Sequence, residues 1–310
     1  MSPRAGALPV PAWSVAVTAM LSVQLSSALA VGLIDAVGPA GTAWLRLSMG
    51  AVIFVAIARP PLRSLRRPEV PWILVLGVAT GLMTVFFLAA IERIPLGTAV
   101  AVEFLGPLAV AAWRAHARSA LAWPALAVVG VVLMTRPWTG EINTAGLAFA
   151  GLAGVGWATY ILLTQRIGDR YAGTTGLSLT IPVAALTAAV AGIPQAHGHL
   201  SGQVLLTALG LALLMPVLPF VCEMVALRHM TPTAFGTLMA LEPAFGVLLG
   251  AMVLHQTPAA FQLVGIALVV AAGAGAQRVG RRTPTDEPVV GSPPIAIGKE
   301  PTELVTRTTS

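Results

Sequence analysis

Two glutamates at matching places in apolar stretches are the residues of this chain best suited to chemistry. The segment GTAVAVE ends at Glu103, and a near copy, GTLMALE, ends at Glu242. A carboxylate in such a surrounding is costly unless it is paired or lines a polar cavity. The same group can bind an ammonium ion or carry a proton. We therefore predict that both glutamates bind substrate or protons, whereas one glutamate alone would fit a structural salt bridge equally well.

A proline follows each of these glutamates. Pro107 lies four residues after Glu103, and Pro243 directly follows Glu242. Because proline has no N–H, the carbonyl four residues earlier loses its helical hydrogen bond. We therefore expect a helix kink with a free backbone acceptor beside each carboxylate. The Gly-Thr at the start of both segments is interpreted as close packing between the two helices.

Two further charged residues fall inside apolar stretches. Arg46, in TAWLRLSMG, either binds a substrate carboxylate or serves pairing and packing, for example by neutralising Glu103; pairing or packing is favoured. Glu223 lies toward the cytoplasmic end of its stretch, which Pro216 and Pro219 are expected to kink. It gates the inner mouth, pairs with the arginine five residues later, or reaches interfacial water, and these interpretations stay open.

Several uncharged polar and aromatic residues are candidates for a cavity lining. They are Gln24, Thr98, Trp157, Tyr160 and Thr237. For Gln24, Trp157 and Tyr160, a packing or interface role is favoured. The sequence holds no metal-ligand spacing, nucleophile elbow or phosphate loop. We therefore predict no enzyme activity, no metal site, no cofactor and no nucleic-acid partner.

The elements that position these residues are expected to be membrane-spanning helices. The chain is 56% hydrophobic and only 10% charged, with a mean hydropathy of +0.85, whereas soluble proteins carry about 25% charged residues. A spanning helix needs about 20 mostly apolar residues. Ten such helices are predicted, at residues 13–34, 38–58, 71–91, 95–113, 119–136, 145–165, 174–194, 203–227, 232–254 and 259–278.

The arginines between these spans predict the orientation. Thirteen fall in the N-terminal segment or in alternate loops, and the opposite loops hold only Arg93 and Arg136. The positive-inside rule makes the arginine-rich side cytoplasmic, with both termini inside. Residues 1–12 are then a cytoplasmic N-terminus, and residues 283–310, rich in Pro, Thr and Ser, a disordered cytoplasmic tail. The first span is expected to stay in place as a helix, and not to be cleaved as a signal peptide.

The matching glutamate segments also predict an internal repeat. Residues 13–136 and 145–278 each contain five spans, with one GT-x4-E segment apiece. Because five is odd, the second copy must run upside down in the membrane. Inverted repeats are typical of secondary transporters, whose substrate site lies near the membrane midplane where the repeats meet.

Three segments resemble a known family. IERIPLGTAVAVEFLGPLAV (91–110), EMVALRHMTPTAFGTLMALEPAFGVLLG (223–250) and WLRL (44–47) resemble the threonine/homoserine exporter branch of the drug/metabolite transporter superfamily, with its duplicated EamA-type domains. The resemblance spans about residues 13–278. It implies ten helices, proton-coupled export of small amino acids across a bacterial plasma membrane, and a central cavity lined by the first, third, fourth, sixth, eighth and ninth spans. The chain departs from the family at His255-Gln256, where relatives commonly have a glutamate.

Together these features predict a secondary exporter that works by proton antiport with alternating access. Its partners are a small amino acid, protons and the lipid bilayer, and the oligomeric state stays open. Two alternatives remain. One is an exporter of aromatic or hydrophobic amino acids or of cationic drugs; the other is a non-transporting scaffold or receptor, which would leave the repeat unexplained.

Overall fold

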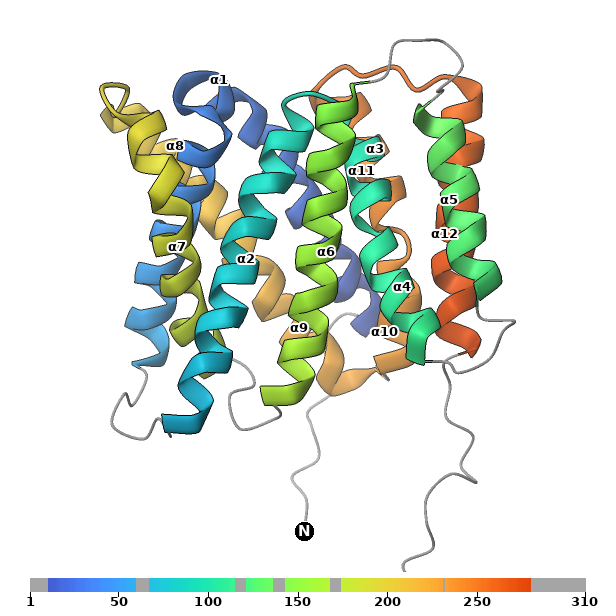
Figure 1. Ribbon diagram of the computed structural model, residues 1–310, viewed down its shortest axis with the longest axis horizontal. Helices are drawn as coiled ribbons and strands as arrows, with labels where there is room; N and C mark the ends of the chain where they lie inside the picture. The colour runs from blue at the N-terminus through green and yellow to red at the C-terminus, as the bar shows by residue number, and fades with distance from the viewer. Residues whose placement is uncertain are drawn as a thin grey trace, which may run out of the picture. The chain divides into compact units, whose positions relative to one another are not determined.

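The computed structural model describes residues 11–59, 67–114, 121–135, 143–167, 174–230 and 232–279. All regular structure in these residues is helical (Figure 1). The predicted N-terminal segment lies almost wholly outside the described residues, and the predicted C-terminal tail lies outside them entirely. The all-helical fold class is thus confirmed for the described part of the chain.

The helices follow the order of the predicted spans. They are α1 (Ala12–Ala58), η2 (Arg67–Glu69), α2 (Val70–Ile91), α3 (Leu96–Glu103), α4 (Leu105–Arg114), α5 (Ala122–Thr135), α6 (Thr144–Ile167), α7 (Thr174–Ala196), α8 (Gly202–Ala212), η6 (Leu213–Val217), α9 (Leu218–His229), α10 (Pro232–Met239), α11 (Glu242–Val253) and α12 (Ala260–Val279).

Most of this helical structure is apolar enough to cross a membrane. Within the described residues, seven stretches qualify by length and composition, and two shorter apolar helices lie at Ala122–Thr135 and Ala260–Ala276. Large apolar side chains face outward, among them Leu186, Val190 and Leu206, which are 70–80% exposed. Such side chains are unfavourable in water but suit contact with lipid. The chain is therefore a multi-pass membrane protein.

The longest element, α1, is interrupted near its middle. Gly38 has φ 72° and ψ 168°, which are not helical, and Pro39 follows it. The chain turns back at this point (Figure 1). The first main-chain amides after the break, on Ala40 and Gly41, donate to Oε1 of Gln195 at the end of α7, at 2.7 and 3.1 Å. The predicted break between the first two spans is thus found at Gly38.

The helices pack in pairs from distant parts of the sequence. The second part of the chain supplies α7, which packs against α1, and α11, which packs against α3. Similarly, α2 packs against α6, and α5 against α12, and the latter two stand side by side at one edge of the bundle (Figure 1). Buried alanines such as Ala30, Ala43 and Ala184 let the helices approach closely.

Three predicted continuous spans are interrupted, which corrects their extents. The span at 95–113 divides into α3 and α4 at Phe104, and the span at 232–254 divides into α10 and α11 at Ala240 and Leu241. The interruptions thus lie beside Glu103 and Glu242. Each agrees with the missing N–H of Pro107 or Pro243, which leaves the carbonyl four residues earlier without its helical partner.

The predicted span at 203–227 has a longer interruption. Residues 213–217 form the irregular segment η6, in which Met215 has an extended backbone, φ −158° and ψ 120°, directly before Pro216. Two serines of α1 reach carbonyls in this segment and in the last turn of α8 before it: Ser22 Oγ donates to Leu214 O at 2.6 Å, and Ser26 Oγ donates to Leu211 O at 3.1 Å. Serine side chains commonly satisfy backbone groups that are freed in membrane helices.

A close approach of two backbones fixes α6 against the junction of α3 and α4. A Cβ added at Gly154 of α6 would lie 2.8 Å from the carbonyl oxygen of Glu103, and a Cβ added at Gly106 would lie 2.0 Å from the carbonyl oxygen of Gly154. Only glycine fits at these two positions. The expected packing role of Gly97 also has a structural counterpart, because a Cβ there would lie 2.1 Å from Cγ2 of Val247 on α11.

Gly106→Ala is expected to destabilise the protein by about 1–3 kcal/mol, the usual cost of overpacking. The new Cβ collides with the backbone of α6, which cannot move aside as a flexible side chain could. The measurement is the thermal unfolding midpoint of the purified protein in detergent.

Gly151→Ala is the matched control, because a Cβ at this position of α6 meets nothing within 4 Å. It should leave the midpoint unchanged or raise it, since alanine is the better helix former. Equal midpoints for the two variants would contradict a tight junction at Gly106.

Candidate functional site

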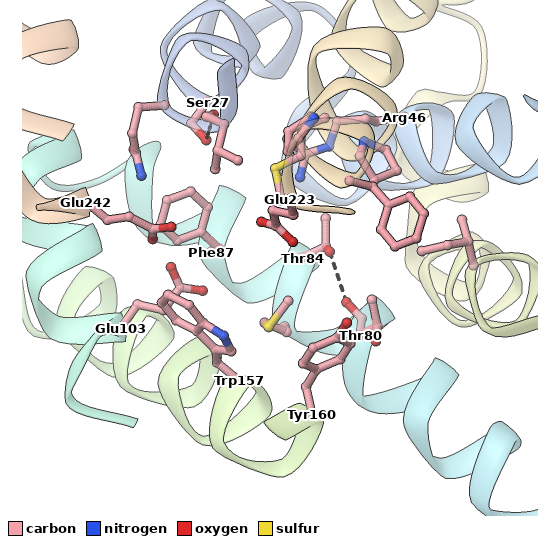
Figure 2. A pocket seen from close by; sticks show the side chains of 18 of the residues that line it. Ser27, Arg46, Thr80, Thr84, Phe87, Glu103, Trp157, Tyr160, Glu223 and Glu242 are labelled. Carbon is pink, nitrogen blue, oxygen red and sulfur yellow. Dashed lines mark hydrogen bonds between the residues drawn. The ribbon is translucent and has the colours of Figure 1, made fainter. Parts of the chain in front are cut away.

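A cavity of about 250 Å³ lies inside the bundle (Figure 2). Its lining residues come from α1, α2, α3, α6, α7, η6, α9, α10 and α11. Every span that the family resemblance implied therefore contributes. The predicted second span, which contains Arg46, and the predicted seventh span, which contains Leu177, contribute as well. Neither α5 nor α12 supplies a lining residue. The residues are Val23, Gln24, Ser27, Arg46, Thr80, Met83, Thr84, Phe87, Glu103, Trp157, Tyr160, Leu177, Ile181, Met215, Pro216, Pro219, Phe220, Glu223, Met239 and Glu242.

Three carboxylates meet in this cavity. Glu103 ends α3, Glu242 begins α11, and Glu223 comes from α9. Their carboxyl groups point toward a common space (Figure 2). Glu242 interacts electrostatically with both of the other glutamates. In the described residues no His, Cys, Asp and Glu side chains gather as a group that could hold a metal ion. The carboxylates are thus arranged to receive a cation or protons.

Glu223 therefore shares the space of the two repeated glutamates. Sequence analysis placed it toward the cytoplasmic end of its span and left its role open. The side chain of the arginine five residues later is not among the described ones, so that pairing stays untested. Pro216 and Pro219, which precede Glu223 on the interrupted segment, also line the cavity, whereas Pro107 and Pro243 do not.

Arg46 supplies a positive charge to the same cavity. Its side chain is 2% exposed and interacts electrostatically with Glu103. Among the described residues it forms no direct ion pair, and its Nη1 is buried without a hydrogen-bond partner. The favoured interpretation, pairing or packing, stays a prediction; the interaction with Glu103 is electrostatic and not a direct ion pair. A guanidinium with a free donor is suited to a carboxylate of a ligand.

The candidate lining residues fall into two groups. Gln24, Trp157 and Tyr160 line the cavity. Trp157 also packs edge-on against Phe104, with the ring centroids 5.9 Å apart. Thr98 lines a separate hollow of about 240 Å³ beside Gln256. Thr237 lines neither of these two hollows.

Sequence reasoning named no lining residue on α2, although the family resemblance implied that this span contributes, and it missed the contribution of α7. Thr80 and Thr84, on one face of α2, line the cavity with Phe87. Leu177 and Ile181 of α7 face the same space. The spacing of four between the two threonines placed them on one helix face and could have been noticed. Nothing in the apolar sequence around Leu177 marks it as a lining residue.

Comparisons with known proteins identify the family of the chain. The model of the EamA-like transporter family matches residues 144–275. "Threonine/homoserine exporter RhtA" of Salmonella typhimurium strain LT2 is 35% identical over 286 residues, which are 89% of this chain and 95% of that protein. The protein of the same name from Escherichia coli strain K12 is 35% identical over 273 residues, 86% of this chain and 92% of that one. The chain belongs to the RhtA-like branch of the drug/metabolite transporter superfamily.

A solved crystal structure shares the fold of this RhtA-like chain. It superposes with a TM-score of 0.59, covers 86% of this chain and 98% of its own, and is 19% identical in sequence. At that identity the likeness concerns the fold alone. The transporter family and the charged cavity rest on separate observations, namely the sequence relatives and the positions of the lining residues.

Arg46→Met is expected to lower the thermal unfolding midpoint in detergent, because the three carboxylates lose a nearby positive charge. Adding Glu103→Gln should recover part of the loss, since one negative charge disappears as well. The expected coupling in a double-mutant cycle is about 0.5–3 kcal/mol.

The control cycle combines Glu103→Gln with Arg93→Met. Arg93 pairs with Glu92 and does not line the cavity, so these two changes should add independently. Additive effects in both cycles would show that Arg46 does not act on Glu103.

Proposed function

We propose that the protein exports small amino acids of the threonine and homoserine type across the bacterial plasma membrane, and that it is not an enzyme. One observation carries the proposal: three glutamates and one arginine line a single cavity inside an apolar bundle. An amino acid carries an ammonium and a carboxylate, which match these charges. The printed names of the relatives support the same cargo.

The size of the cavity favours a small cargo over a drug. Its volume of about 250 Å³ lies below the range of about 300–1,000 Å³ that is typical of drug-sized ligands. The lining adds four aromatic rings, those of Phe87, Trp157, Tyr160 and Phe220, which suit the apolar part of a side chain. A small zwitterion therefore fits better than a large cation.

Transport proceeds by proton antiport with alternating access. The ammonium of a cytoplasmic amino acid meets Glu103 or Glu242, and its carboxylate meets Arg46. A proton that enters from outside neutralises a carboxylate and weakens its hold on the ammonium. The substrate then leaves outward. The helix interruptions beside Glu103 and Glu242 supply junctions about which each span can bend.

The proposed architecture has ten spans, with both termini inside and residues 145–278 inverted relative to residues 13–136. The break at Gly38 supports two spans within α1, and the shorter apolar helices α5 and α12 complete the number. The matching interruptions at Phe104 and at Ala240–Leu241 support the repeat. The side of the membrane follows from the arginine distribution.

Glu103→Gln and Glu242→Gln are each expected to lower pH-driven threonine transport in proteoliposomes by about tenfold or more, the scale of a lost hydrogen bond to a charged group. The amide keeps the shape of the side chain but neither binds an ammonium ionically nor carries a proton.

Glu92→Gln is the control for the same chemical change, because Glu92 pairs with Arg93 and lies outside the cavity. It should transport as the wild type does. Wild-type pH-driven rates in both cavity variants would rule out coupling through these carboxylates.

The inverted repeat is tested by labelling the loops after the second and seventh spans. In a Cys222→Ser background, which removes the single cysteine, Pro68→Cys and His199→Cys place thiols at exposed positions. An impermeant maleimide should label His199→Cys in intact cells, and should label Pro68→Cys only after permeabilisation. Labelling of both from the same side would contradict the inversion.

A further inference from the structure

Two buried polar atoms of the cavity lack a hydrogen-bond partner in the described part of the chain. They are Oε1 of Gln24 and Nη1 of Arg46, and each side chain is 2% exposed. Buried polar groups are nearly always hydrogen-bonded, so an exception calls for an explanation. Here both exceptions line the same cavity. Gln24 Oε1 accepts a hydrogen bond and Arg46 Nη1 donates one. A ligand that satisfies both atoms must therefore offer a hydrogen-bond donor to Gln24 and an anionic acceptor to Arg46.

The serine and threonine hydroxyls that line the cavity do not satisfy Gln24. Ser27 Oγ donates to Val23 O at 2.9 Å, Thr80 Oγ1 donates to Leu76 O at 2.8 Å, and Thr84 Oγ1 donates to Thr80 O at 2.9 Å. Each of these lining hydroxyls thus gives its one proton to the backbone of its own helix (Figure 2 draws the bond of Thr84). None of the described residues supplies a donor to the amide oxygen of Gln24, so this oxygen can accept one from a bound molecule.

The charges of the cavity decide which donor that is. A substrate ammonium is drawn to the glutamates, because hydrogen bonds between charged groups are stronger than those to a neutral amide. The neutral acceptor on Gln24 is left for a neutral donor, such as an aliphatic hydroxyl. Arg46, whose Nη1 is free, is left for the carboxylate.

Building on the proposed function, we propose that Gln24 is the residue that selects amino acids with a side-chain hydroxyl. Its Oε1 accepts the hydroxyl proton while Arg46 Nη1 donates to the carboxylate. Valine has nearly the shape of threonine but a methyl group in place of the hydroxyl. When valine binds, Gln24 Oε1 stays buried and unpaired. Sites that bind a hydroxyl by hydrogen bond reject an analogue without it for this reason.

The test compares efflux of labelled threonine and labelled valine from proteoliposomes that contain the full chain. The wild type should favour threonine. In Gln24→Met, which is apolar and of similar length, the threonine-to-valine rate ratio should fall about tenfold, with valine efflux rising relative to threonine. Gln24→Asn keeps an amide but withdraws it by one methylene, so its ratio should lie between the two.

Ser26→Ala is the matched control on the same helix. Ser26 is buried and bonds to Leu211 O, but it does not line the cavity. Its substitution removes a polar group from α1 and should leave the ratio unchanged. A ratio that falls equally in Ser26→Ala would overturn a specific role of Gln24.

The carboxylate contact is tested by competition. Added 1-amino-2-propanol, which is threonine without its carboxylate, should compete with labelled threonine at least tenfold less well than threonine itself does. Equal competition would overturn the role of Arg46.

Failure of this inference can be separated from failure of the proposed function. If the wild type exports neither amino acid, amino-acid export itself is wrong. If it exports threonine and valine equally, or if Gln24→Met and Gln24→Asn both keep the wild-type ratio, export stands and selection by Gln24 is overturned. If Gln24→Met loses both threonine and valine efflux, its thermal unfolding midpoint shows whether the variant is still folded. The threonine-to-valine ratio of Gln24→Asn, the milder change, then decides whether Gln24 selects the hydroxyl.

Discussion

The structure depends on placing four charged side chains in an apolar bundle. Each ionised group that leaves water costs free energy unless partners or solvent replace its hydration. One guanidinium faces three carboxylates in the cavity, so the chain cannot neutralise its own charges by pairing alone. The remainder must come from protons, water or a cationic ligand. This imbalance separates the cavity from a structural salt bridge, in which one acid would meet one base.

The sequence was most informative at charged residues inside apolar spans, where burial of the charge costs free energy and packing alone does not explain the residue. A glutamate in an apolar span must face a partner or a cavity, so Glu103 and Glu242 could be placed together before any coordinates. Pro107 and Pro243 predicted a disturbance beside each one. The full separation of α3 from α4 and of α10 from α11 depends on the neighbouring helices, and these are set by tertiary packing. The sequence could not predict that Gln24 Oε1 lacks a hydrogen-bond partner, because this depends on where the surrounding polar groups of other helices lie in the folded structure.

Glycine links the helix junction to its surroundings. Gly106 and Gly154 bring the backbone of α6 against the carbonyl of Glu103, which is the carbonyl that Pro107 leaves without a helical N–H. Trp157, one turn further along α6, both lines the cavity and packs edge-on against Phe104. The position of the Glu103 side chain is therefore coupled to α6 through backbone and ring contacts. A shift of α6 would move the carboxylate and the aromatic wall of the cavity together.

Two glutamines show how the proposed repeats are held at one end of the bundle. Gln195 accepts hydrogen bonds from Ala40 and Gly41, and Gln256 Oε1 accepts one from the main-chain amide of Leu96 at 3.1 Å. In both cases a residue of 145–278 caps the start of a helical segment in 13–136. Hydrogen bonds of this kind contribute about 0.5–1.5 kcal/mol each. These bonds add to a much larger apolar interface between the proposed repeats, in which α1 packs against α7, α2 against α6 and α5 against α12. In the proposed topology both glutamines lie on the outer side, so opening the cavity there must release these bonds and also shift apolar contacts between the two repeats.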